Sequence, residues 1–272
     1  MLRDKIMQSF LDAFSSLQSL VPADVFERLL IWGLNIFIFY FVFTSLRTLF
    51  LLAKISFYNR FLAYRGRAIK VERATGEKRI LILGDSTAVG TGASRSEDTI
   101  AGRLARDFPN AAIINRGVNG AVTADIGKQL QGAGEGKFNV VIISVGGNDA
   151  VHFTGRHEMQ SALQASLKQA KEISNHRVLL LIYNNIASAP IFPAFIRWRL
   201  RRSADTMQLV FRKVAEEEQV PCIDLFSQGN DNPFLREPRK FFAPDGIHPS
   251  SEGYRLWYNR MWRTLTERGY AF

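Results

Sequence analysis

The sequence predicts an α/β fold whose central sheet is parallel and carries helices on both faces. Short runs that are apolar throughout recur along the chain from residue 79 onward, and stretches with helical spacing of apolar residues separate them. Strands that are apolar on both sides need cover on both faces, and alternation with helices is typical of parallel sheets. No repeat or low-complexity segment interrupts this part, so we interpret it as one domain.

Length and composition limit the classes of protein. The 272 residues suffice for one such domain and an N-terminal appendage, and a hydrophobic content of 47% argues against global disorder. The single cysteine, Cys222, excludes an internal disulfide and a cysteine-built zinc site, and we expect a packed thiol. The formal net charge of +10 indicates an anionic partner, either nucleic acid or an anionic membrane.

Residues 1–28 predict an amphipathic helical region. Apolar side chains recur at helical spacing from Leu2 to Leu20, with polar residues between them. The segment lacks the order of regions that defines a signal peptide, so we expect it to be retained. Pro22 and Asp24 interrupt this helix and are suited to begin a second one.

Residues 29–53 predict a membrane-anchoring helix. Leu29–Leu46 is an uncharged apolar run of eighteen residues, and TLFLLA extends it beyond Arg47. A membrane-spanning helix needs about 20 apolar residues, so the length suffices when Arg47 reaches the interface. A buried or interfacial helix is the alternative, but apolar and aromatic residues on every side favour the membrane.

Residues 54–78 predict a basic juxtamembrane linker. Eight lysines and arginines lie from Lys54 to Arg79, and only Glu72 and Glu77 oppose them. Such a cluster attracts anionic lipids. The positive-inside rule favours a cytoplasmic catalytic domain. Basic residues also flank the other end of the apolar run, so a periplasmic or extracellular position stays open.

Residues 79–272 predict the α/β domain, with strands and helices in alternation. The strand-like runs are Ile80–Leu83, Ala111–Asn115, Val140–Val145, Val178–Tyr183 and Val220–Leu225. The helix-like runs are Thr99–Asp107, Ala124–Leu130, His157–Ile173, Ile196–Glu218 and Ser251–Arg268. The turns after parallel strands meet at one edge of the sheet, so we expect the chemistry there.

Ser86 is the candidate nucleophile, because it follows the first strand in a small-residue turn, Gly84-Asp85-Ser86. Such a turn alone is more often structural than catalytic. Near the other end of the chain, Asp245 stands three residues before His248. Histidine is suited to be a general base near neutral pH, and an adjacent carboxylate can fix its tautomer.

Two further turns offer donors for a developing oxyanion. Gly120 ends the turn NRGVNG after the second strand and can bring a backbone N–H close to a ligand. Asn148 lies in the turn GGND after the third strand and supplies a side-chain amide. Preorganised donors of this kind are what acyl transfer requires.

Taken together, these motifs resemble the four sequence blocks of the SGNH/GDSL hydrolase family. The blocks are Gly84-Asp85-Ser86, Gly120, Gly146-Gly-Asn148-Asp149 and Asp245-Gly-Ile-His248, in that order between Arg79 and the C-terminus. The resemblance implies a three-layer α/β/α sandwich with a five-stranded parallel sheet in flavodoxin-like order. It also implies metal-free hydrolysis of esters or thioesters, or acyl transfer, through an acyl-enzyme.

The resemblance assigns a role to each matching residue. Ser86 would be the nucleophile, His248 the base and Asp245 the residue that orients it. The oxyanion donors would be the backbone N–H groups of Ser86 and Gly120 and the side chain of Asn148. Thr87 stands where the GDSL pattern has leucine, at a position that is not catalytic.

Cofactor and metal sites are not indicated. The segment from Gly84 to Gly92 lacks the lysine of a phosphate-binding loop and the third glycine of a dinucleotide fingerprint. Asp245 and His248 lack a third residue with metal-ligand spacing. We therefore expect neither a cofactor nor a metal.

Residues 189–202 mix aromatic and basic side chains. Phe192, Phe195 and Trp198 alternate with Arg197, Arg199, Arg201 and Arg202. This composition suits a membrane interface, stacking on single-stranded nucleic acid, or a solvated basic helix face. Because the chain carries an anchoring segment, we favour the membrane and expect no nucleic-acid partner. We predict Phe192, Phe195 and Trp198 as substrate contacts.

The sequence thus predicts a membrane-associated serine hydrolase that cleaves acyl esters, with an esterase, lysophospholipase or thioesterase-like activity. The alternative enzyme is an O-acetyl esterase or acyltransferase that acts on envelope polysaccharide, outside the cytoplasm. A membrane-tethered scaffold with an inactive site is the non-enzymatic alternative. The complete set of motif residues argues against the scaffold. The sequence indicates no oligomeric state.

Overall fold

The computed structural model describes residues 7–9, 12, 16, 22–65, 78–183, 185–225 and 232–269. The chain divides into two compact units, Met1–Lys54 and Ile55–Phe272. The amphipathic helix expected near the N-terminus falls almost entirely outside the described residues, as does the part of the predicted linker at 66–77.

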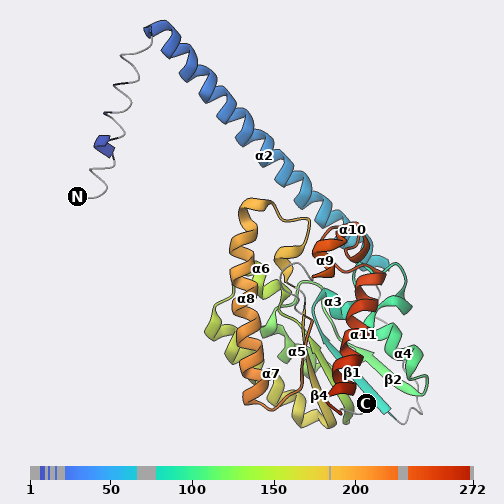
Figure 1. Ribbon diagram of the computed structural model, residues 1–272. Coiled ribbons are helices and arrows are strands. Elements are labelled where there is room, and N and C mark those ends of the chain that lie inside the picture. The colour runs from blue at the N-terminus through green and yellow to red at the C-terminus, as the bar shows by residue number, and fades with distance from the viewer. Residues whose placement is uncertain are drawn as a thin grey trace. The chain divides into compact units, whose positions relative to one another are not determined.

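Helix α2 (Ala23–Arg65) contains the predicted anchoring segment (Figure 1). Its stretch Ala23–Leu51 is long and apolar enough to cross a membrane, and none of its most apolar window is buried. The 29 residues of this stretch span about 43 Å, more than the roughly 30 Å of bilayer hydrocarbon. The helix continues beyond the boundary expected at residue 53, so the first part of the predicted linker is helical.

Five parallel strands form one sheet in the order β2-β1-β3-β4-β5. The strands are β1 (Lys78–Gly84), β2 (Ala111–Asn115), β3 (Phe138–Ser144), β4 (Ser174–Ile182) and β5 (Cys222–Asp224). This is the flavodoxin-like order, whose strand sequence reverses next to β1 and creates a crevice at the carboxyl ends. The predicted fold class is confirmed.

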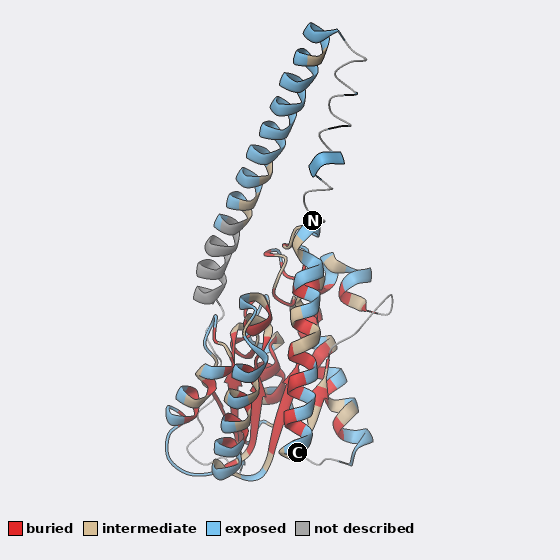
Figure 2. Ribbon diagram, turned by 90° about the vertical axis from the view of Figure 1, so that its left-hand side faces the viewer, coloured by how far each residue is buried: buried red, intermediate tan, exposed pale blue. Residues whose placement is uncertain are grey.

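Helices cover both faces of the sheet. One face carries α5 (Ile126–Gln131), α7 (Arg156–Ile173) and α8 (Ala194–Glu217), which bury one large apolar cluster against the strands. The other face carries α4 (Ile100–Asp107) and α11 (Ser251–Glu267) (Figure 1). Figure 2 shows buried strands between helices whose outward sides are exposed. The strands are apolar throughout because both their faces are covered.

The structure also contains several short helical elements that the sequence does not predict, although the 3-10 turn Thr123–Asp125 overlaps the start of the predicted helix Ala124–Leu130. They are α3 (Ser86–Val89), α6 (Gly147–His152), α9 (Pro233–Arg236), α10 (Pro238–Phe241) and the 3-10 turns η1 (Ser96–Asp98), η2 (Thr123–Asp125) and η3 (Ile186–Ser188). Capping chemistry explains α3, because the Asp85 side chain accepts the Thr87 N–H at its start. Helices α9 and α10 each begin with a proline, whose fixed φ suits the first turn of a helix.

Gly84 lets β1 end against β3 without a side chain between them. Its φ is +145°, and a Cβ there would lie 1.8 Å from the carbonyl oxygen of Ser144. The Gln129 side chain completes the contact, since its amide both donates to and accepts from the Gly84 backbone at 2.9 and 2.8 Å. The last residue before the Asp85-Ser86 turn is therefore held from two sides.

We expect Gly84→Ala to lower the free energy of unfolding by about 2–4 kcal/mol, because the new methyl overlaps a neighbouring strand. Urea unfolding of the full chain in detergent, followed by tryptophan fluorescence, measures this. Gly155→Ala is the matched control, since no atom lies within 4 Å of the new Cβ. Equal effects of the two substitutions would contradict the close approach.

Candidate active site

Ser86 begins helix α3 directly after β1. Asp85 precedes it as the N-cap, and its carboxylate oxygen Oδ1 accepts the backbone N–H of Thr87 at 2.8 Å and the Thr87 hydroxyl at 2.6 Å. The Asp85 backbone N–H donates to the Ser144 carbonyl at 3.1 Å, so the turn stays tied to β3. These bonds fix the position of Ser86 at the carboxyl edge of the sheet.

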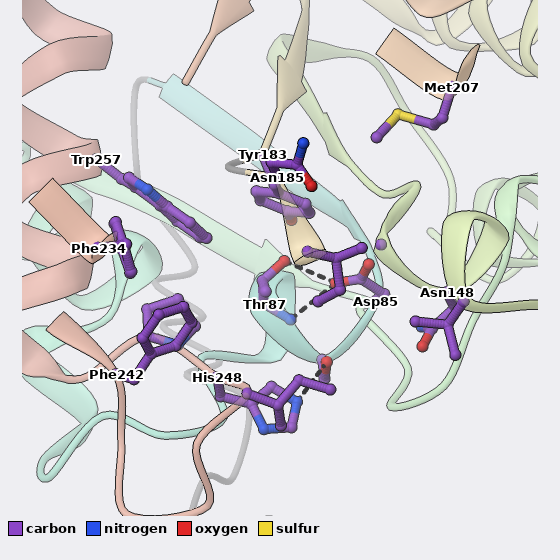
Figure 3. Close-up of a pocket in the computed structure, with 16 residues that line it drawn as sticks. Asp85, Thr87, Asn148, Tyr183, Asn185, Met207, Phe234, Phe242, His248 and Trp257 are labelled. Atoms are coloured by element: carbon purple, nitrogen blue, oxygen red, sulfur yellow. Dashed lines mark hydrogen bonds between the residues drawn. The ribbon is translucent and has the colours of Figure 1, made fainter. Parts of the chain in front are cut away.

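His248 and Asp245 reach Ser86 from the segment before α11. The Ser86 Oγ lies 2.9 Å from His248 Nε2, and a dashed line marks this hydrogen bond at His248 in Figure 3. On the other side of the ring, His248 Nδ1 lies 2.6 Å from Asp245 Oδ2. The other carboxylate oxygen of Asp245 accepts the backbone N–H groups of Ile247 and His248, each at 3.0 Å. Hydroxyl, imidazole and carboxylate thus form one chain, as the sequence predicts for these three residues.

The protonation of this chain follows from its partners. Burial acts to raise the pKa of Asp245, but the hydrogen bond and charge of His248 and the two backbone N–H groups act against it, and its pKa is lowered. An ionised carboxylate only accepts hydrogen bonds, so the proton of a neutral His248 resides on Nδ1. Nε2 is then the acceptor that faces the Ser86 hydroxyl, which is the tautomer a general base needs.

Asn148 is the fourth predicted residue that the structure brings to the site. It lines the same pocket as Ser86 and His248, and its Nδ2 donates to the Ala121 carbonyl at 2.9 Å. Gly120 precedes Ala121, with a φ of +81° that favours glycine, and lines a neighbouring hollow instead. The amide of Asn148 therefore links the two turns that carry the predicted oxyanion donors.

Asp149 holds those two turns in place. It is buried, and its Oδ2 accepts the backbone N–H and the hydroxyl of Thr123, each at 3.0 Å. Burial is the main cause that raises the pKa of Asp149, and the two bonds from Thr123 oppose it. The fourth residue of the GGND turn is thus a structural tie rather than a group that faces the pocket.

The pocket beside Ser86 has an apolar wall that the sequence analysis missed. The wall residues are Val151, Tyr183, Ile186, Met207, Phe234, Phe242 and Trp257. Figure 3 shows the aromatic side chains Phe234, Phe242 and Trp257 on one side of Thr87, and Met207 and Asn148 on the other. For two of them, the sequence indicates a position near the site: Val151 follows the GGND turn, and Tyr183 ends a predicted strand. No sequence motif indicates the other five.

The predicted substrate contacts Phe192, Phe195 and Trp198 do not line this pocket. Phe195 and Trp198 are 70% and 61% exposed on the first turns of α8. The helix turns its buried side, with Leu200 and Ala204, toward the domain, so these two aromatic side chains point away from it. These three residues are therefore not part of the described pocket, and their contact with a substrate stays a prediction.

No group of three or more histidine, cysteine, aspartate or glutamate side chains with metal-binding geometry occurs among the described residues.

A hydroxyl–imidazole–carboxylate chain at the edge of a parallel α/β sheet is an arrangement shared by several classes of hydrolase that transfer acyl groups. The sequence model of the GDSL-like lipase/acylhydrolase family matches residues 82–256. The chain belongs to this family, which confirms the resemblance found in the sequence and the class of ester hydrolases.

Solved structures share the fold at low sequence identity. A lipolytic protein of the G-D-S-L family from Veillonella parvula is 17% identical, with a TM-score of 0.55 over 70% of this chain and 98% of its own. The lipase/acylhydrolase from Enterococcus faecalis is 22% identical, with a TM-score of 0.54 over 70% and 96%. LAE5, from the metagenome of Lake Arreo, is 20% identical, with a TM-score of 0.55 over 71% and 96%. No curated protein matches the chain.

Asp85 makes the stability of the site depend on pH. Burial is the main cause that raises the pKa of its carboxyl to about 6, against 3.8 ordinarily. Hydrogen bonds from Thr87 and the nearby His248 act to lower it, and Asp149 acts to raise it. The folded state therefore keeps a proton that the unfolded chain loses between about pH 4 and 6. Stability from this group falls as the pH rises through that window.

We expect Asp85→Asn to gain stability relative to the wild type as the pH rises. The variant keeps an oxygen that accepts from Thr87 but removes the titration, so the difference in unfolding free energy should shift by about 2–3 kcal/mol between pH 4 and pH 7. Urea unfolding of both proteins at the two pH values measures it. A difference that stays constant with pH would contradict the raised pKa.

Proposed function

We propose that the protein hydrolyses acyl esters with Ser86 as nucleophile, His248 as general base and Asp245 as the residue that orients it. The observation that supports this proposal most directly is the continuous chain of 2.9 and 2.6 Å contacts from Ser86 Oγ to Asp245. Nucleophile, base and orienting group in hydrogen-bond reach are the signature of covalent catalysis.

In the proposed reaction, Ser86 Oγ attacks the carbonyl carbon of the ester while His248 Nε2 takes the hydroxyl proton. The developing oxyanion accepts hydrogen bonds from the Ser86 backbone N–H and the Asn148 side chain. The Gly120 backbone N–H stays a predicted third donor, since Gly120 lines the neighbouring hollow. The carbon–oxygen bond to the alcohol then breaks, and His248 returns its proton to the leaving oxygen. A water molecule, deprotonated by His248, attacks the acyl-enzyme, releases the acid and restores Ser86.

We infer that the acyl group carries an apolar chain. The wall of the pocket next to Ser86 is built mainly of aliphatic and aromatic side chains, including Val151, Met207 and Trp257. Burial of hydrocarbon there is favourable by about 0.8 kcal/mol per methylene. Esters of amphiphilic character, such as lysophospholipids or acyl thioesters, fit this pocket better than acetylated sugars do.

We also propose that α2 anchors the enzyme in a membrane. Its stretch Ala23–Leu51 has the length and composition of a span, and its aromatic side chains are exposed. In water, a helix that is apolar on all sides exposes its apolar side chains to solvent, whereas a bilayer buries every side of it. A substrate with a lipid chain would then be available at the same membrane.

Ser86→Ala tests the catalytic assignment. We expect the turnover of p-nitrophenyl butyrate to fall at least about a thousandfold, because no other hydroxyl faces His248 Nε2 among the described residues. Ser94→Ala, which changes an exposed serine in the following loop, should turn over p-nitrophenyl butyrate at the rate of the wild type. A fluorophosphonate probe should label the wild type and not Ser86→Ala. A folded wild type that the probe does not label would favour the scaffold alternative.

Val151→Trp tests the acyl pocket. A larger side chain in the wall should lower kcat/KM for p-nitrophenyl octanoate at least about tenfold relative to the acetate, since a long chain needs the space and an acetyl group does not. Leu209→Trp is the control, because Leu209 is exposed on α8 and does not line the pocket. A wild type that prefers the acetate would favour the O-acetyl esterase alternative.

A further inference from the structure

The first turns of α8 present a surface of aromatic and cationic side chains. Phe195, Trp198, Arg199 and Arg202 are exposed there, and the ring of Phe153, beyond the end of α6, joins them. We call these five residues the α8 surface. None of the five lines the pocket of the proposed active site.

Helix geometry places four of these residues on one side. At 3.6 residues per turn, positions 195, 198, 199 and 202 fall within roughly one third of the helix circumference. The buried residues Leu200, Ala204 and Phe211 occupy the opposite side. Packing inside the domain therefore does not explain why positions 195 and 198 are large and aromatic.

The α8 surface is strongly cationic. Arg197 and Arg201 flank the two arginines of the surface, and none of the four forms a salt bridge with a described residue. The first acidic residue of α8 is Asp205, about two turns beyond Trp198. The surface therefore carries unneutralised positive charge next to exposed aromatic rings, a combination that suits the interface of an anionic bilayer.

The arginines cover faces of the two rings that they contact. The guanidinium carbon of Arg199 lies 4.6 Å from the ring centre of Phe153, and that of Arg202 lies 5.8 Å from the ring centre of Trp198. A nucleic-acid base needs a free ring face for stacking. A bilayer interface accepts tryptophan together with arginine, whose charge stays among the headgroups. Each arginine covers only one face of its ring, so the choice of lipid over nucleic acid rests on the proposed membrane anchor α2 in the same chain.

The α8 surface adjoins the elements that build the pocket. Val151 of α6 lines the pocket, and Phe153 follows two residues later. Met207 of α8 also lines it, about 13 Å along the helix axis from Trp198. Figure 1 shows the beginning of α8 at the same end of the domain as the carboxyl ends of the strands, close to α6.

We propose that the α8 surface docks onto an anionic phospholipid bilayer and holds this end of the catalytic domain at the lipid surface. The aromatic side chains enter the interface, and the arginines bind lipid phosphates. Docking would bring the pocket close to lipid-like substrates, and this consequence rests on the proposed function. The docking itself does not require hydrolysis. The pocket is thereby brought to the membrane by a second contact, separate from α2.

Tryptophan quenching in vesicles tests the docking. The full chain with Trp32→Leu, which removes the tryptophan of α2, is reconstituted into brominated phosphatidylcholine vesicles with and without phosphatidylglycerol. The emission that disappears with Trp198→Leu is assigned to Trp198. We expect bromine to quench this emission at least about fivefold more in the anionic vesicles, and high salt to weaken the effect.

Charge variants separate docking from simple proximity. Arg199→Glu with Arg202→Glu should reduce the quenching to the level of the zwitterionic vesicles, and the milder Arg199→Gln with Arg202→Gln should reduce it in part. Leu209→Ser, an exposed position three turns beyond Trp198 on the same helix, should leave it unchanged. Ser86→Ala should also leave it unchanged, so loss of hydrolysis and loss of docking are scored independently.

Equal quenching in both kinds of vesicle, or quenching that survives charge reversal, would overturn the proposal. So would a chain that fails to float with the vesicles. Tight, salt-sensitive binding of a single-stranded oligonucleotide to the detergent-solubilised chain, without quenching in anionic vesicles, would assign the surface to nucleic acid instead.

Discussion

The hydrogen bond between Ser86 and His248 joins residues 162 positions apart, and the structure at the carboxyl edge of the sheet serves to hold them together. Two further contacts join the same segments: the Tyr254 hydroxyl donates to the Thr91 carbonyl at 2.8 Å, and the Ser94 N–H donates to the Ser251 hydroxyl at 3.0 Å. Gly92 allows the approach, since a Cβ there would lie 2.5 Å from the Pro249 carbonyl oxygen. A contact this long-range depends on the packing of α11 against the sheet, not on local structure.

The support beneath the nucleophile is polar and buried, which is unusual for the centre of an α/β domain. Asp85, Ser144 and Tyr183 are all nearly inaccessible. The Tyr183 hydroxyl donates a hydrogen bond to the Ser144 hydroxyl, and the Asp85 carboxylate accepts hydrogen bonds from the backbone N–H and the hydroxyl of Thr87. Burial raises the pKa of Asp85, so its charge is unfavourable there. A domain that keeps such a group trades stability for a rigid turn at the position where geometry matters most.

In our proposal, the chain combines this rigid centre with surfaces that favour contact with lipid. The pocket wall is apolar, α2 has the length of a membrane span, and the α8 surface joins exposed aromatic rings to arginines that form no salt bridge with a described residue. Each feature has a different physical origin, namely burial of an acyl chain, hydrophobic insertion and interfacial charge. Together they support the proposal that this ester hydrolase meets its substrate at a membrane.

The sequence by itself determined the parallel α/β fold, and it predicted Ser86, Asn148, Asp245 and His248, which the structure brings together at one edge of the sheet. Strands covered on both faces have a local apolar signature, and the chemistry follows their ends in short motifs, so both can be recognised without a structure. The pocket wall as a whole could not be recognised from the sequence, because most of its side chains come from five separate elements, α6, η3, α8, α9 and α11. No regular sequence spacing relates residues from different elements. Tertiary packing alone decided which aromatic residues line the pocket beside Ser86. It turned Trp257 inward with the buried face of α11 and left Trp198 outward on α8, although both lie on amphipathic helices of similar composition.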